Sequence, residues 1–140
     1  MKIFIICSKA FYHDAKPIVK VLEEKGHQVT VPNSFDHPSL ESEMWRAGED
    51  VHAKFKKEML LQSEQIIAGM DAVLCLNFEK DGKPNYIGGA TFLELYEAFM
   101  KGKKIFLWND IPEGMLFDEI SAFQPVIISG NLDVINKEHE

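Results

Sequence analysis

Short apolar runs alternate with longer amphipathic segments along this chain. The apolar runs are continuous and do not alternate with polar residues, which is typical of strands buried on both faces of a parallel sheet. They predict strands at residues 3–7, 28–31, 71–77, 103–108 and 126–129.

The segments between these runs carry apolar residues at helical spacing. They predict helices at residues 14–25, 51–68, 91–101 and 115–123. Asp14 is the expected N-cap of the first helix, and Gly26 is the expected residue just past its end. Residues 32–50 hold two prolines, many polar residues and an aromatic cluster, so we expect a long, mobile connection there. Residues 137–140 are expected to form a frayed end.

This order of elements predicts one α/β domain over residues 1–140. We expect a flavodoxin-like (Rossmann-like) three-layer sandwich whose five-stranded parallel sheet has the order 2-1-3-4-5. Ligands in such sheets bind beyond the carboxyl ends of the strands, where strands 1 and 3 lie side by side. The loops at residues 7–14, 77–91 and 109–114 are therefore the expected place for a site.

The composition narrows the class of partner. The chain is 46% apolar and 26% charged, which is ordinary for a globular protein. Its formal net charge of −7 argues against a broad surface for nucleic acid or for membranes. No apolar run approaches the roughly 20 residues that span a bilayer, and the apolar start is too short for a signal peptide. We therefore expect a cytoplasmic protein with a small-molecule ligand and with neither nucleic acid nor membrane as partner.

Cysteine and histidine spacing gives no support to a metal site. Cys7 and Cys75 each lie in a separate apolar run and form no CxxC pair, so both are expected to be buried, reduced thiols. The histidines show no ligand spacing. No metal is expected.

The stretch from Gly88 to Glu94 has two interpretations. Glycines at a helix start let backbone N–H groups approach a ligand closely, and a carboxylate there can serve as a nucleophile. Thr91 and Glu94 also match a capping box, in which Glu94 only caps its own helix. The local pattern by itself favours the cap, with the nucleophile as the alternative.

Three segments together resemble the nucleoside 2-deoxyribosyltransferase superfamily, which also includes deoxynucleoside 5′-monophosphate N-glycosidases. They are the run 71–77 opened by an Asp, Gly88-Gly89 followed by Glu94-Leu95, and the Gly-Lys turn at residues 102–103. The resemblance implies an enzyme of nucleotide metabolism, either a transferase or a hydrolase. It would cleave or exchange the N-glycosidic bond of a nucleoside or nucleoside 5′-monophosphate through a covalent glycosyl intermediate on Glu94. It also implies that no cofactor is needed, and that the protein forms a homodimer or a higher homo-oligomer.

Several residues at the expected strand ends are candidates for binding the substrate. The resemblance places Ser8 and Lys9 at the 5′ end of the substrate and the backbone of Gly88 and Gly89 around the pocket. Polar groups at the same edge and one aromatic that could cover the base complete the set: Asn85, Tyr86, Asn109, Asp110 and Trp45. The alternatives are purely structural: an ordinary polar turn at Ser8, and packing of the Trp45 loop against the core.

Two departures from the family pattern favour a different class of function. Ser63 stands where the family commonly has an Asp, and four residues rather than one separate Gly89 from Glu94. These changes favour a non-catalytic nucleotide-binding or regulatory module on the same fold. A flavodoxin-like electron carrier has little support, because the loop after the first strand lacks the run of Ser and Thr that would cradle a flavin phosphate.

Overall fold

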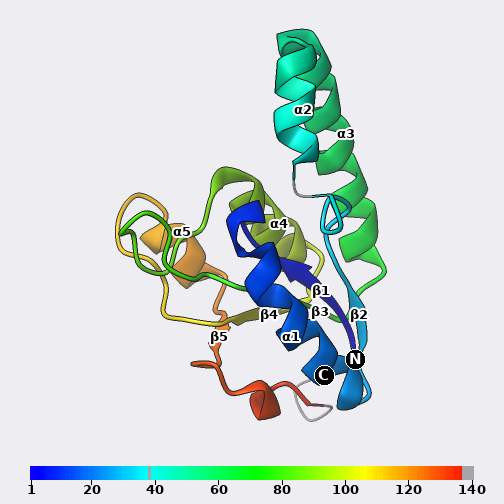
Figure 1. Ribbon diagram of the computed structural model, residues 1–140. Coiled ribbons are helices and arrows are strands. Elements are labelled where there is room, and N and C mark those ends of the chain that lie inside the picture. Colours follow the sequence, from blue (N-terminus) through cyan, green and yellow to red (C-terminus); the bar gives the residue numbers. More distant parts are fainter. Residues whose placement is uncertain (38, 137–140) are drawn as a thin grey trace.

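The computed structural model describes residues 1–37 and 39–136, which form a parallel sheet with helices on both faces (Figure 1). The sheet has five strands in the order β2-β1-β3-β4-β5, and every pair is parallel. This confirms the predicted α/β fold and the predicted strand order. The strands are β1 (Lys2–Ile6), β2 (Gln28–Thr30), β3 (Ala72–Cys75), β4 (Lys104–Leu107) and β5 (Val126–Ile127).

The helices divide between the two faces of the sheet (Figure 1). They are α1 (Tyr12–Glu24), α2 (Leu40–Ala47), α3 (Glu49–Ala68), α4 (Gly89–Met100) and α5 (Phe117–Ala122), with short 3-10 turns at Lys9–Phe11 and Leu132–Val134. Helix α1 begins before Asp14, which lies in its first turn and is not its N-cap. Gly26 follows the end of α1 with a φ of 92°, a conformation that glycine adopts without strain.

The expected connection at residues 32–50 is wrong in its second half, which is helical. Helix α2 turns back on the start of α3 at Gly48, whose φ of 130° suits glycine. The Trp45 ring stacks on the His52 ring with centroids 4.0 Å apart. An eight-residue helix is only marginally stable on its own, so α2 depends on this packing. The local sequence gives no sign of the packing, which is why the helix was not predicted. Residues 137–140, predicted to be frayed, lie outside the described residues.

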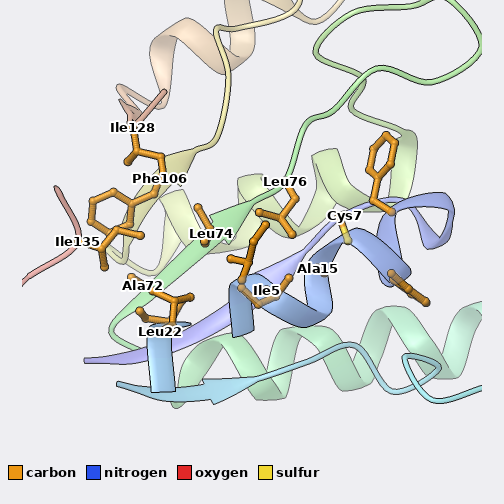
Figure 2. Close-up of a cluster of buried hydrophobic side chains, with 14 of the residues drawn as sticks. Ile5, Cys7, Ala15, Leu22, Ala72, Leu74, Leu76, Phe106, Ile128 and Ile135 are labelled. Atoms are coloured by element: carbon orange, nitrogen blue, oxygen red, sulfur yellow. The ribbon is translucent and has the colours of Figure 1, made fainter. Parts of the chain in front are cut away.

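Two apolar layers hold the sheet between the helices. Alternate side chains of β1 and β3 point to opposite faces: Ile5 and Leu74 pack toward α1, where they meet Leu22 (Figure 2). Phe4 and Val73 pack toward α3, α4 and α5. Because both faces are covered, the strands show the continuous apolar runs from which they were predicted.

Opposite edges of the sheet are held by different polar contacts. At the amino ends of the strands, the Lys2 backbone N–H donates to Asp71 Oδ2 at 2.8 Å, which gives Asp71 a structural role there. At the carboxyl ends, the fully buried Asn77 joins the segments that follow β3 and β4. Its Oδ1 accepts from the Asn109 backbone N–H at 2.8 Å, and its Nδ2 donates to the carbonyls of Asn109 and Asp110.

Replacing Asn77 tests how far this bridge stabilises the carboxyl edge. Asn77→Ala leaves one backbone N–H and two carbonyls without the amide that satisfies them, so we expect a loss of about 2–4 kcal/mol in the free energy of unfolding. Urea denaturation measures it. Asn109→Ala is the matched control, because it removes a single side-chain bond to the Asn77 carbonyl. Equal losses in the two variants would contradict the role given to the Asn77 amide.

Candidate functional site

A cavity of about 310 Å³ lies beside the carboxyl end of β1. Its walls come from the turn after β1, the connection after β2, helices α2 and α3, the loop after β3 and the first turns of α4. This is the crevice in which sheets of this topology bind ligands. Its volume is at the lower end of the roughly 300–1,000 Å³ typical of small-molecule sites.

Helix α4 presents Glu94 to this cavity. The helix begins at Gly89 with Gly88 as its N-cap, and no side chain caps it. Thr91 therefore lies inside the helix, buried on the sheet side with Leu95, and the predicted capping box is wrong. Local pattern favours a Thr-x-x-Glu cap, but packing of α4 on the sheet uses Thr91 as a core residue.

Packing on the sheet sets which face of α4 is buried. Leu95 and Ala98 are fully buried, while Tyr96 and Phe99 are 44% and 43% exposed. This orientation leaves the half-buried Glu94 among the residues that line the cavity, together with residues of α3.

The environment of Glu94 changes its acid–base behaviour. Burial disfavours the charged form and raises the pKa of the carboxyl from 4.5 to about 7. A hydrogen bond with the Ser63 hydroxyl and the charge of Lys56 oppose this rise. Both partners come from α3, two helical turns apart, and both line the cavity. A carboxyl that titrates near neutrality can serve as a nucleophile or transfer a proton.

Cys7 lines the same cavity but is a poor nucleophile. Burial, with a smaller effect of the Glu94 charge, raises the pKa of its thiol to about 12. The thiolate is the reactive form, so Cys7 remains a neutral, inert wall residue near pH 7.

Six of the predicted site residues line this one cavity: Ser8, Lys9, Tyr86, Gly88, Gly89 and Glu94. Tyr86 lies close against Gly88, where an added Cβ would come within 3.2 Å of the Tyr86 hydroxyl. Nothing lies within 4 Å of a Cβ placed on Gly89, so that glycine leaves open space at the helix start.

The other four predicted binding residues lie elsewhere. Asn85 and Asp110 line a separate, open cavity of about 920 Å³. Tyr86 lines both this cavity and the one that holds Glu94. The Asn109 side chain donates to the Asn77 carbonyl and serves the strand ends. Trp45 stacks on His52 in the α2–α3 hairpin, is 53% exposed and is not among the residues that line either cavity.

Sequence reasoning missed the charged residues that α2 and α3 bring to the cavity. Glu41 comes from the segment expected to be a loop, and Lys56 from the expected helix, while Lys80 comes from the loop after β3. Lys56, Met59 and Ser63 all line the cavity, and their spacing on α3 places them on one face. That spacing was the available signal.

The part of the chain that the structure describes holds neither a metal-binding cluster nor a membrane-spanning helix. Its His, Cys, Asp and Glu residues form no group of three or more that could hold a metal ion. Within residues 1–37 and 39–136, no helix is both long and apolar enough to cross a bilayer.

The raised pKa of Glu94 predicts a pH-dependent effect on stability. Between pH 4.5 and about 7 the folded protein holds a proton on Glu94 that the unfolded chain releases, so the wild-type loses stability as pH rises through this window. We expect Glu94→Gln to be more stable than wild-type at pH 8, by up to roughly 3 kcal/mol, and about equal to it at pH 4. Denaturant titrations at the two pH values measure the difference. Glu97→Gln, on the same helix but away from the cavity, should show no such gain, and a gain for Glu94→Gln at pH 4 as large as at pH 8 would refute the effect.

The fold resembles that of one enzyme of known structure. No family model and no curated protein sequence matches the chain. A solved structure of a 2-deoxyribosyltransferase from the psychrotolerant bacterium Bacillus psychrosaccharolyticus superposes on it with a TM-score of 0.52 and 20% sequence identity. The match covers 87% of this chain and 81% of that one. The protein therefore has the fold of a 2-deoxyribosyltransferase.

Proposed function

We propose that the protein cleaves the N-glycosidic bond of a nucleoside or nucleoside 5′-monophosphate, by hydrolysis or by exchange of the base. The observation that carries the proposal is the Glu94 carboxylate, which lines the cavity at the carboxyl edge of the sheet with a pKa of about 7. The fold shared with a 2-deoxyribosyltransferase supports it.

In the proposed reaction Glu94 acts as the nucleophile. The ionised carboxylate attacks the anomeric carbon, a glycosyl ester forms, and the C–N bond breaks with its electron pair leaving on the base. The departing base takes a proton from water. A water molecule, or a second base, then attacks the same carbon and gives up a proton to the hydroxide left by the first step, and the ester C–O bond breaks to release the Glu94 carboxylate.

The residues around Glu94 suit this role. Both the ionised and the neutral form of the Glu94 carboxyl are populated near pH 7, since the pKa lies at about that pH. Lys56 favours the ionised form, and the Ser63 hydroxyl holds the carboxylate by a hydrogen bond without adding a second negative charge. Serine in place of an acid at this position is therefore compatible with a charged nucleophile. Gly89 leaves open space at the helix start, where a sugar could approach.

A non-catalytic nucleotide-binding module remains the second candidate. Ser63 in the place of an Asp, and the longer spacing between Gly89 and Glu94, favour it. Such a module would bind the same ligands and release no base from them during prolonged incubation.

We also propose that the protein forms a homodimer or a higher homo-oligomer. Helix α4 exposes four large apolar side chains, with exposed fractions of 43–62%: Leu93, Tyr96, Phe99 and Met100. On the same helix, Lys101 Nζ lies 3.6 Å from Glu97 Oε2 and 3.4 Å from Glu64 Oε1. These charged side chains therefore pair with one another within one chain. Apolar patches of this kind mark interaction sites.

Substitution of Glu94 tests the nucleophile. Glu94→Gln should lower the rate of base release by about a thousandfold or more, because an amide cannot form the ester. Release of free base from a panel of ribo- and deoxyribonucleosides and their 5′-monophosphates is followed by chromatography. Glu97→Gln should retain wild-type activity. Mass spectrometry of the wild-type with substrate should find a glycosyl adduct on Glu94, and wild-type turnover by Glu94→Gln would exclude the assignment.

The pH profile tests the ionisation of Glu94. Because the carboxylate is the reactive form, kcat/KM should rise with pH through about 7 and then level off. Ser63→Ala removes a hydrogen bond that lowers the pKa of Glu94, so its profile should shift to higher pH. A profile that falls across this range, or that does not move in Ser63→Ala, would count against Glu94 as the titrating nucleophile.

The oligomer proposal is tested at the apolar face of α4. Light scattering should give a mass at least twice that of one chain for the wild-type. Met100→Glu should give the mass of a monomer, because it places a charge in the apolar patch. Glu97→Gln should leave the mass unchanged, and a wild-type monomer at high concentration would refute the proposal.

A further inference from the structure

The cavity already holds a carboxylate that the proposed reaction does not use. Glu41 lines the cavity from α2 and accepts hydrogen bonds from two side chains of α3. Its Oε1 accepts a hydrogen bond from His52 Nε2 at 3.2 Å, and its Oε2 accepts one from Lys56 Nζ at 3.4 Å. Since a carboxylate only accepts, the Nε2 of His52 carries the proton.

A second lysine lies close to Glu41. Lys9 lies in the 3-10 turn after β1, its Nζ donates to the Ser42 hydroxyl at 3.5 Å, and its charge acts on Glu41. Burial alone would raise the pKa of Glu41, but the His52 hydrogen bond and the charges of Lys56 and Lys9 outweigh it and hold the pKa below its usual value. Glu41 is therefore ionised at neutral pH.

The charges of the cavity differ in sign from those of the whole protein. The chain carries a net charge of −7, yet three lysines line this cavity against two glutamates, Glu41 and Glu94. The third lysine, Lys80, lies over the Tyr86 ring at 4.7 Å. Without Glu41, Lys9, Lys56 and the Nε2 proton of His52 would be available to bind a ligand in the cavity.

Helix α2 can withdraw Glu41 without disturbing the core. None of its side chains is buried, and its packing is against α3. Figure 1 shows α2 and the adjoining part of α3 rising beyond the sheet as a hairpin. Moving the start of α2 therefore breaks the contacts of Glu41 and Ser42 with the cavity wall and leaves the apolar layers of the sheet intact.

We propose that Glu41 occupies, in the free protein, a subsite for a phosphate monoester, and that a nucleoside 5′-monophosphate displaces it. The phosphate oxygens would accept the hydrogen bonds of His52 and Lys56 that Glu41 accepts, with Lys9 as a second cation beside Lys56. The inference rests on the proposed function for the nucleoside part of the ligand only. A neutral nucleoside offers nothing to replace the carboxylate, so this cavity selects the monophosphate.

Binding measurements on matched variants test the subsite. Calorimetric titrations would use inorganic phosphate, the four common deoxynucleoside 5′-monophosphates and the corresponding nucleosides, all in the Glu94→Gln background so that no turnover interferes. Adding Glu41→Gln should strengthen the binding of phosphate and of at least one monophosphate by about tenfold, because the competing charge is gone. The affinity for the nucleosides should change less than about twofold.

Two further variants make the result specific to the cavity. Lys56→Gln should weaken phosphate and monophosphate binding by about tenfold, since it removes a cation of the subsite. Glu43→Gln is the control: it removes the same charge from the same helix, but Glu43 pairs with His37 at 2.8 Å and does not line the cavity. It should leave every affinity unchanged.

The outcomes separate this inference from the proposed function. Unchanged or weaker phosphate binding in the Glu41→Gln variant, or an equal gain for nucleosides and monophosphates, overturns the subsite even if the wild-type releases base. Monophosphate binding that depends on Glu41 and Lys56, in a wild-type that releases no base, supports the subsite while the enzymatic proposal fails. Gain with inorganic phosphate but with none of the monophosphates also overturns it, because the nucleotide would then not reach the subsite.

Discussion

The packing of α3 against α4 is the contact on which the site depends. Helix α4 is oriented by Thr91, Leu95 and Ala98, which are buried against the sheet, and this orientation leaves Glu94 lining the cavity. Helix α3 supplies the Ser63 hydroxyl and the Lys56 charge that act on that carboxyl. A small rotation of either helix would separate these groups, so the acid–base character of Glu94 is a property of the helix pair.

The pKa values of two carboxyl groups in one cavity, Glu94 and Glu41, are shifted in opposite directions by their surroundings. Burial dominates at Glu94 and raises its pKa, whereas the His52 hydrogen bond and the charges of Lys56 and Lys9 outweigh burial at Glu41 and lower its pKa. Lys56 acts on both groups, which couples the α2 hairpin to the candidate nucleophile. Such divergence between neighbouring titratable groups is how one cavity assigns different roles to the same residue type.

The sheet was predictable because its signal is local and repeated. Apolar runs buried on both faces, separated by helical patterns, leave few topologies open, and the parallel order follows from the rules of chain connection. The failures lie where tertiary contacts overrule local preference. Helix α2 has no buried side chain and forms by packing on α3, and Thr91 serves the core although its sequence pattern is that of a cap. In both cases the stabilising partner lies on another element.

The sequence by itself determined the fold class, the strand order and the edge of the sheet where a site should lie, and it singled out Glu94. Those features depend on the periodicity of apolar residues and on the chain order of the elements. Only the tertiary structure decided that Glu94 lines a cavity rather than caps its helix, that Asn109 hydrogen-bonds the Asn77 carbonyl, and that Trp45 stacks on His52. It alone brought Glu41, Lys56 and Lys9 together. The physical reason is that burial and charge pairing act between residues far apart in the chain, which no local pattern records.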